Sequence, residues 1–268
     1  MLAVSLRLQM LTPPGFISLT KIVRTLMKVR ETFLKMRDHE RLSVEGTLDK
    51  LSEYAKTDNI MKKADAVFMA TQRPMVHIDS SGKEAGNAIG MAPRGGICTK
   101  DKVAIGKDKP GTYSGISTIV HELGHLLGLP HDGDKGAEAC LGNHGYIMSP
   151  VHGGKRDNEW SQCSKNLVKE VLRSRKYWCL NENKNKHLSP LKLKLKPGMV
   201  INGEEYCTKS FPNYNAKFDE SLPTDNCSFR CKLETSGAKT KEATIFAPEG
   251  TPCQPGKHEK KCRYGLCI

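Results

Sequence analysis

Apolar positions in the first two thirds of the chain follow strand and helix periods in turn. The run 65–71, DAVFMAT, is short and apolar and predicts a buried strand. Over 47–55, apolar residues recur every three or four positions, which predicts a helix with Thr47 as its N-cap. Strands that alternate with helices predict an α/β domain with a mostly buried sheet.

Two further helices are expected downstream. One spans 117–127, where apolar residues again recur every three or four positions, and Gly128 ends it. The other spans 164–173 and begins after Ser161 or Ser164, since either hydroxyl could cap it. No apolar run approaches the 18 residues that a membrane helix needs, so we expect no membrane span.

Cysteine is concentrated at the C-terminal end of the chain. The last 62 residues hold six of the ten cysteines: Cys207, Cys227, Cys231, Cys253, Cys262 and Cys267. This density is typical of a disulfide-stapled module made in an oxidising compartment, and it predicts a secreted protein. The alternative is a cytosolic zinc module, but the closest cysteine spacings are C-x3-C and C-x4-C rather than C-x2-C. Six cysteines allow fifteen connectivities, and the sequence does not choose among them.

Composition and charge divide the chain into three predicted parts. These are an ordinary domain over 1–182, a basic linker over 183–197 and a cysteine-rich module over 198–268. The chain has 42 Lys and Arg against 29 Asp and Glu, a net charge of +13. Residues 183–268 hold 15 basic and 9 acidic residues, or +6, and we expect this region to attract acidic glycans. The basic residues are dispersed and no nucleic-acid motif accompanies them, so we expect no nucleic-acid partner.

The segment HELGHLLGLPH combines three histidines and a glutamate. On a helix, His121 and His125 project from one face one turn apart and can hold the same ion. Gly128 lets the chain leave the helix, and the following turn returns His131 as a third ligand. Glu122 lies beside these ligands, where it can act on a water molecule. Three imidazoles leave a coordination position open, which is typical of catalytic rather than structural zinc.

A purely structural role for these histidines is the competing interpretation. Two histidines four residues apart beside a glutamate do occur by chance. The glycine at 128 and the third histidine at 131 leave little room for coincidence.

This pattern is the H-E-x-x-H-x-x-G-x-x-H signature of the metzincins, and the chain resembles that group. Met148, in the segment YIMSP, matches the Met-turn of the family, which implies an apolar floor beneath the three imidazoles. Asp132 follows the third histidine and resembles the marker of the reprolysin (adamalysin) branch, which holds snake-venom metalloproteases and the ADAM and ADAMTS proteases. The resemblance implies a metzincin fold, an α/β domain with a mixed, mostly parallel twisted sheet. It also implies Glu122 as the general base.

Further segments resemble reprolysins, and some resemble the ADAMTS type most. They are 86–92 (GNAIGMA), 95–98 (GGIC), 160–164 (WSQCS) and 178–180 (WCL). This similarity implies that Cys98 pairs with Cys179 and Cys140 with Cys163. The tail resembles the cysteine-rich module that follows ADAMTS catalytic domains, with fewer cysteines. A compact reprolysin with such a tail is similar to arthropod, notably tick, salivary metalloproteases.

The resemblance also suggests what precedes the chain and a second metal. Reprolysin domains have a strand and a long helix ahead of the segment that 2–22 matches, so we expect an N-terminally incomplete domain from a longer precursor. Some relatives bind calcium opposite the cleft, and Asp65 and Glu182 match two of the expected ligand positions.

The predicted function is a secreted zinc metalloendopeptidase that cleaves extracellular proteins, with matrix or plasma proteins such as gelatin or fibrinogen as substrates implied by the family. Substrate would lie extended along an edge strand at 87–93, and residues 149–152 would wall the pocket after the cleaved bond. The alternative is a secreted cysteine-rich binding protein with an inert protease domain. The intact histidines and Glu122 favour the enzyme.

Overall fold

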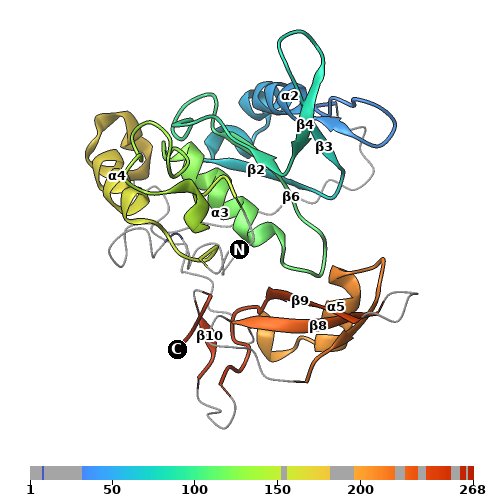
Figure 1. Cartoon of the computed structure of the whole chain (residues 1–268). Coiled ribbons are helices and arrows are strands. Elements are labelled where there is room, and N and C mark those ends of the chain that lie inside the picture. The colour runs from blue at the N-terminus through green and yellow to red at the C-terminus, as the bar shows by residue number, and fades with distance from the viewer. Residues whose placement is uncertain are drawn as a thin grey trace.

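The computed structural model describes Leu8 and residues 32–151, 156–181, 196–220, 227–234, 240–254, 260–263 and 265–268. These form an α/β part over 32–181 and a smaller β-rich part over 196–268 (Figure 1). Residues 183–195, most of the predicted linker, lie outside the described part, as does the front segment except Leu8. The three-part division and the missing front portion therefore stay predictions. No helix in the described ranges is both long and apolar enough to cross a bilayer.

Helix α2 (Val44–Thr57) follows directly from the short strand β1 (Leu42–Ser43). Its N-cap is Ser43, whose Oγ accepts a hydrogen bond from the Gly46 amide at 3.2 Å. The prediction of Thr47 as the cap is wrong, because Ser43 has the extended backbone of a cap residue and a short side chain whose hydroxyl reaches the first turn. Thr47 is instead buried in the first turns, where its Oγ1 accepts a 3.1 Å hydrogen bond from the Lys35 amide.

Two three-stranded sheets lie beside α2, with strand orders β1–β3–β4 and β2–β6–β5 (Figure 1). Their remaining strands are β2 (Val67–Thr71), β3 (Met75–Ile78), β4 (Glu84–Ala88), β5 (Gly90–Met91) and β6 (Val103–Lys107). The predicted strand at 65–71 is confirmed as β2. Each sheet has one parallel and one antiparallel pairing, so the expectation of a mostly parallel sheet is wrong for the described strands. The tight turn 79–83 joins β3 to β4, and so short a connection can link only antiparallel strands.

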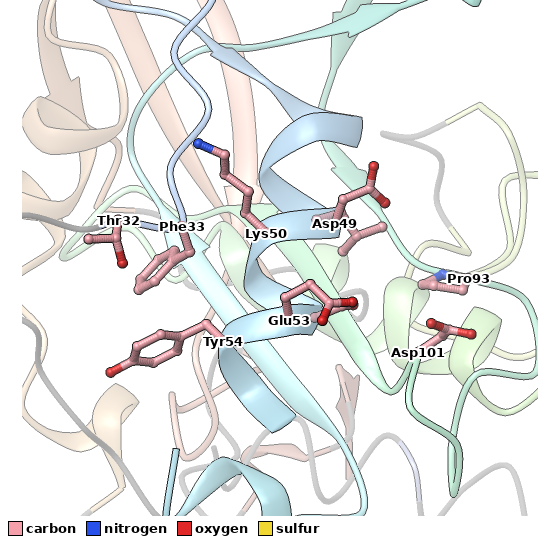
Figure 2. Close-up of a pocket in the computed structure, with 10 residues that line it drawn as sticks. Thr32, Phe33, Asp49, Lys50, Glu53, Tyr54, Pro93 and Asp101 are labelled. Carbon is pink, nitrogen blue, oxygen red and sulfur yellow. The ribbon is translucent and has the colours of Figure 1, made fainter. Parts of the chain in front are cut away.

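The outer surface of α2 contributes to a pocket of about 630 Å³. Figure 2 shows Phe33 beside Tyr54, with ring centroids 5.2 Å apart and the ring planes tilted by 47°. Glu53 is directed toward the side of the pocket formed by Pro93 and Asp101. No histidine is among the described residues that line it, so this pocket is separate from the histidine motif.

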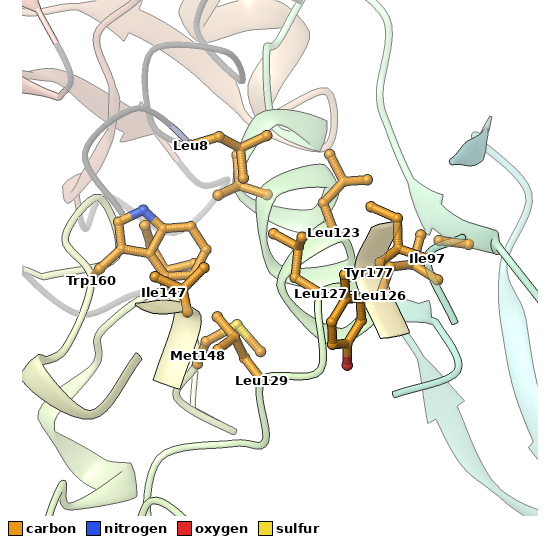
Figure 3. Close-up of a cluster of buried hydrophobic side chains, with 13 residues drawn as sticks. Leu8, Ile97, Leu123, Leu126, Leu127, Leu129, Ile147, Met148, Trp160 and Tyr177 are labelled. Atoms are coloured by element: carbon orange, nitrogen blue, oxygen red, sulfur yellow. The ribbon is translucent and has the colours of Figure 1, made fainter. Parts of the chain in front are cut away.

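Helix α3 (Gly115–Leu126) packs against β6 and carries the histidine motif. It begins two residues before the predicted start, where the Asp108 carboxylate accepts a 3.1 Å hydrogen bond from the Gly115 amide. Its buried face forms a core with residues from the segments that follow (Figure 3). The main buried members are Ile97, Ala104, Val120, Leu123, Leu126, Leu127, Leu129, Ile147, Met148, Trp160, Val168 and Tyr177.

Helix α4 (Gln162–Arg173) starts at Ser161, whose Oγ accepts a 3.1 Å hydrogen bond from the Ser164 amide. Short 3-10 turns, η2 (Gly142–His144) and η3 (Arg175–Asn181), flank this region. Two disulfides, Cys98–Cys179 and Cys140–Cys163, link it to the rest of the domain and are the pairs that the resemblance implied. They close loops of 81 and 23 residues, which corresponds to about 4.5 and about 3.4 kcal/mol in the chain-entropy model.

The tail folds around three further disulfides, Cys207–Cys231, Cys227–Cys262 and Cys253–Cys267. Its elements are η4 (Pro197–Met199), α5 (Gly203–Ser210), β7 (Asn215–Phe218), β8 (Ser228–Glu234), β9 (Thr240–Phe246), β10 (Cys262–Arg263) and β11 (Leu266–Cys267). All ten cysteines are described and none is free, so the alternative of a zinc module in the tail is excluded.

The tail packs on the loop that precedes α3. The Tyr206 hydroxyl, on α5, lies 2.7 Å from the carbonyl oxygens of both Thr112 and Phe246. Tyr206 is buried, and this burial raises the pKa of its hydroxyl. The Lys109 ammonium also donates to the Ser210 carbonyl at 3.4 Å. The contact therefore joins the cysteine-rich part to the N-terminal end of the helix that carries the motif.

Candidate active site

The three motif histidines converge through their Nε2 atoms. His121 and His125 lie one turn apart on α3, and His131 comes from the turn beyond the helix. The His131 Nε2 lies 3.2 Å from that of His121 and 3.1 Å from that of His125. All three donor atoms fall within 4.8 Å of one another. The structure thus brings together the residues that the spacing predicted as metal ligands.

Backbone carbonyls orient two of these imidazoles. The His121 Nδ1 lies 2.6 Å from the carbonyl oxygen of Ile147, and the His125 Nδ1 lies 2.9 Å from that of Leu129. A carbonyl can only accept, so each Nδ1 carries a proton, and in the neutral ring each Nε2 then presents a lone pair. Burial lowers the pKa of His125 to about 4, so its ring is neutral at pH 7, as a metal ligand must be.

The third imidazole is held by the turn at Gly128. This glycine has φ +95°, and a Cβ there would lie 2.7 Å from the Tyr177 hydroxyl. The Arg94 Nε donates a 2.9 Å hydrogen bond to the Gly128 carbonyl and so fixes the turn from outside. The His131 Nδ1 lies 3.6 Å from a carboxylate oxygen of Asp134. All three Nδ1 atoms therefore face acceptors.

This donor set fits zinc. In their neutral form, imidazole nitrogens that converge as closely as these, with two pairs 3.1 and 3.2 Å apart, repel one another unless a cation lies between them. Zn–N bonds of 2.0–2.1 Å in a tetrahedral site correspond to nitrogens about 3.4 Å apart, close to the separations here. Imidazole is also a preferred ligand of zinc.

Glu122 directly follows His121 on α3 and is 5% exposed. Its Oε2 has no hydrogen-bond partner among the described residues. Burial raises the pKa of Glu122 to about 8. A cation bound to the adjacent imidazoles would lower this pKa, because an opposite charge favours the carboxylate. Glu122 is thus a buried carboxyl group whose ionisation depends on a nearby positive charge.

Met148 is fully buried close to Leu129 (Figure 3), and its side chain lies against Gly124 of α3. A Cβ at Gly124 would lie 2.5 Å from its Sδ and 3.5 Å from Trp160, so only glycine allows this approach. The predicted Met-turn therefore contacts the motif helix through sulfur and, at Ile147, through the carbonyl that holds His121.

Asp132 is 2% exposed and ties the third-ligand turn to its neighbours. Its amide donates a 2.8 Å hydrogen bond to the Met148 carbonyl. Its Oδ1 accepts a 2.7 Å hydrogen bond from Ser161. Burial raises the pKa of Asp132, and the hydrogen bond from Ser161 opposes that rise. The family-marker position is therefore a buried link between His131, the Met-turn and α4.

A sequence model described as Reprolysin (M12B) family zinc metalloprotease matches residues 37–184, more than half of the chain. The chain belongs to the reprolysin family. The matched range holds the three histidines, Glu122 and Met148, so the family assignment and the geometry concern the same residues.

Individual relatives of this reprolysin come from venom and from ADAMTS proteins. The chain is similar to the venom metalloproteinase BumaMPs1 of Olivierus martensii, 37% identical over 133 residues, which cover 48% of this chain and 34% of the relative. It is also similar to "A disintegrin and metalloproteinase with thrombospondin motifs 19", which is 29% identical over 249 residues in Homo sapiens and 31% identical over 209 residues in Mus musculus. The human alignment covers 90% of this chain and 19% of the relative; the mouse alignment covers 76% and 16%. The chain thus spans about a third or less of the relatives it matches.

The structure places only one of the two predicted calcium ligands of this reprolysin. Asp65 precedes β2 and lies near the Lys102 ammonium. The Lys102 Nζ donates hydrogen bonds to the Lys62 and Ala64 carbonyls at 3.0 and 2.5 Å. Glu182 lies outside the described residues, as does residue 152 of the predicted pocket wall. The calcium site therefore stays a prediction.

Sequence reasoning missed the glycines that shape this reprolysin site. Gly124 lies inside a helix, where glycine costs about 1 kcal/mol relative to alanine. A glycine at such a position indicates that another group packs closely against the helix there. Gly90 gave no such sign, because its contact is with Glu122, 32 residues away. The carbonyls of Ile147 and Leu129 that orient the imidazoles carry no signal in the residue types themselves.

Proposed function

We propose that this chain is a secreted zinc metalloendopeptidase that hydrolyses extracellular proteins. The observation that carries the proposal is the convergence of three Nε2 atoms, two pairs of them 3.1 and 3.2 Å apart, at the helix that also carries the buried Glu122. Zinc, when bound, supplies a Lewis acid that polarises the peptide carbonyl and lowers the pKa of water toward about 7. We assign the metal to His121, His125 and His131.

Glu122 then moves one proton. Its carboxylate removes a proton from the water that attacks the peptide carbonyl, and a C–O bond forms. It delivers that proton to the amide nitrogen as the C–N bond breaks, so that it acts as base and then as acid. Its burial supports this role, because a desolvated carboxyl group binds a proton more readily than an exposed one.

The substrate would lie extended against the edge of the sheet. Strand β5 is the last strand in the order β2–β6–β5, and β4 is the last in β1–β3–β4, so each is an edge strand of its sheet. The segment 87–93 includes the end of β4 and all of β5. An added strand can pair with such an edge through backbone hydrogen bonds. Ile89, at the junction, is 49% exposed and is available to an apolar substrate side chain. Residues 149–152 would wall the pocket beyond the cleaved bond.

The remaining features support an extracellular setting. Five disulfides are compatible with an oxidising compartment. The names of the relatives include a venom metalloproteinase, so a secreted source such as venom or saliva fits. The proposed substrates are matrix or plasma proteins. We also propose that the chain divides into a protease domain ending at 182, a basic linker ending at 197 and a cysteine-rich module, and that the linker binds acidic glycans. A calcium ion at Asp65 and Glu182 is a separate proposal, tested by the change in Tm on addition of calcium to the zinc-loaded protein.

The decisive experiment is hydrolysis of casein or gelatin by the zinc-loaded protein. We expect cleavage that stops with a zinc chelator and returns when zinc is restored. The control is Lys169→Gln, on the exposed surface of α4, which should behave as the parent does. A well-folded, zinc-loaded chain without activity would favour the alternative, a cysteine-rich binding protein with an inert protease domain.

A further inference from the structure

Two glycines face each other across strands β5 and β6. Gly90 pairs with Gly106 in the antiparallel register. A Cβ at Gly106 would lie 2.6 Å from the Thr118 methyl group, and a Cβ at Gly90 would overlap the Glu122 Oε1 and lie 2.8 Å from its Cδ. Thr118 and Glu122 are four residues apart and share one face of α3. This face of the helix therefore lies directly on the glycine pair.

We propose that Gly90 is a positioning residue for Glu122. Its missing side chain leaves the space that the Glu122 carboxylate occupies at the edge strand. The inference rests on the proposed function, because it concerns the group that moves the proton. It also links the two halves of the site, since the strand that would bind the substrate backbone is the strand that sets the position of the base.

The two glycines differ in what a side chain would disturb. At Gly106 a Cβ would meet Thr118 and also lie 2.7 Å from the Phe68 ring, so packing between the sheet and α3 would have to change. At Gly90 the three nearest atoms are the Oε1, Cδ and Cγ of Glu122, and the two closest belong to the carboxylate at the end of this flexible side chain. Gly90 is not among the residues with positive φ, so alanine suits its backbone. An alanine at 90 should therefore move the carboxylate and leave the fold in place.

Alanine substitutions at the two glycines should therefore differ in whether they mainly lower kcat or mainly lower Tm. A displacement of about 1 Å in a catalytic group can reduce a rate by about 10²-fold. For Gly90→Ala we expect kcat to fall by about 10- to 100-fold, with KM within about 2-fold, zinc content unchanged and Tm close to that of the parent. For Gly106→Ala, the matched control, we expect a clear fall in Tm and a smaller loss of kcat than in Gly90→Ala.

A shorter side chain at position 122 tests whether Gly90 acts through the glutamate. Glu122→Asp withdraws the carboxylate from β5 by one methylene. In that background Gly90→Ala should reduce kcat by less than about 3-fold, because little remains for the Cβ to displace. An equal loss in both backgrounds would mean that Gly90 acts by another route and would overturn the proposal.

The experiment uses the full zinc-loaded chain, a fluorogenic peptide, bound zinc per chain, thermal unfolding and a crystal structure of Gly90→Ala. We expect the crystal structure to show a displaced Glu122 carboxylate on an unmoved α3. An unmoved carboxylate, or a loss of Tm or zinc as large as in Gly106→Ala, overturns the proposal. If the parent protein cleaves nothing, the proposed function fails, yet the crystal structure still decides whether Gly90 positions Glu122.

Discussion

The Ser161 hydroxyl donates a 2.7 Å hydrogen bond to the buried Oδ1 of Asp132. The same hydroxyl accepts a hydrogen bond from the Ser164 amide and so caps α4. Asp132 follows His131 directly, and its amide is bonded to the Met148 carbonyl. One serine therefore connects the start of a helix, the third-ligand turn and the Met-turn.

Loss of the Ser161 hydroxyl should affect both the fold and the metal. Ser161→Ala removes a cap, at about 1 kcal/mol, and leaves a buried carboxylate oxygen without its donor, at about 1–3 kcal/mol. We expect a fall of about 2–4 kcal/mol in the free energy of unfolding and weaker zinc binding, measured by urea denaturation and by chelator competition. Asn202→Ala, which removes only the cap of α5, should cost about 1 kcal/mol and leave zinc affinity unchanged. Equal zinc affinities in the parent and Ser161→Ala would contradict the link.

Glu122→Gln should retain zinc and lose hydrolysis. The three imidazoles are untouched, whereas the amide can no longer accept a proton from water. We expect kcat to fall by at least about 10²-fold, the low end for loss of an acid–base group. The measurement is peptide hydrolysis at matched zinc content. Near-normal turnover would show that another group moves the proton.

His131→Ala should reduce the zinc that remains bound after dialysis. The third donor is lost, and two imidazoles on α3 alone give an incomplete site. His144→Ala is the matched control, because His144 lies in the same region and contacts the Tyr146 ring rather than the histidine cluster. We expect His144→Ala to keep its zinc. If His131→Ala retained all of its zinc, His131 would not be a zinc ligand.

Glu45 should make stability depend on pH in the acid range. Burial alone would raise its pKa, but hydrogen bonds from the Ile78 amide at 2.9 Å and from His77 at 2.8 Å outweigh burial and lower it below 4.5. A carboxyl group with a lowered folded pKa contributes stability above its unfolded pKa and loses it as pH falls through the folded value. The Tm difference between the parent and Glu45→Gln should therefore be constant above about pH 5 and shrink below it. Glu53→Gln, on the exposed surface of α2, is the control and should show a smaller difference.

The basic linker should strengthen binding to heparin. The lysines to replace by glutamine are Lys184, Lys186, Lys192, Lys194 and Lys196. The control replaces the same number of exposed lysines in the protease domain: Lys50, Lys63, Lys83, Lys135 and Lys169. Coulombic attraction is screened over about 8 Å at physiological salt, so the linker variant should elute from a heparin column at lower salt than the control. Equal elution of the two variants would rule out a special contribution from the linker.

Local patterns predicted the helices and the donor set, because those features depend on neighbouring residues. The spacing within HELGHLLGLPH fixes which imidazoles share a helix face, and apolar periods located α3 and α4. The N-cap of α2 was misplaced because two hydroxyls, Ser43 and Thr47, lie close to the helix start, and only the strand before Ser43 distinguishes them.

Features that depend on distant residues were not predictable. Strand β5 runs antiparallel to β6, which pairs Gly90 with Gly106. This pairing depends on how the loop between the two strands folds, and the sequence pattern does not specify that. The tail cysteines offered fifteen pairings, and only the sheet β7–β8–β9 and the short β10–β11 ribbon determine which sulfurs meet.

The Cys98–Cys179 disulfide has a consequence for how the protein matures. Ile97, beside Cys98, donates its amide to the Leu126 carbonyl at the end of α3, and Tyr177, two residues before Cys179, covers the Gly128 turn. The covalent bond thus anchors both sides of the turn that presents His131. We expect oxidation of this pair to precede tight zinc loading, so that a chain kept in a reducing compartment would remain poor in metal.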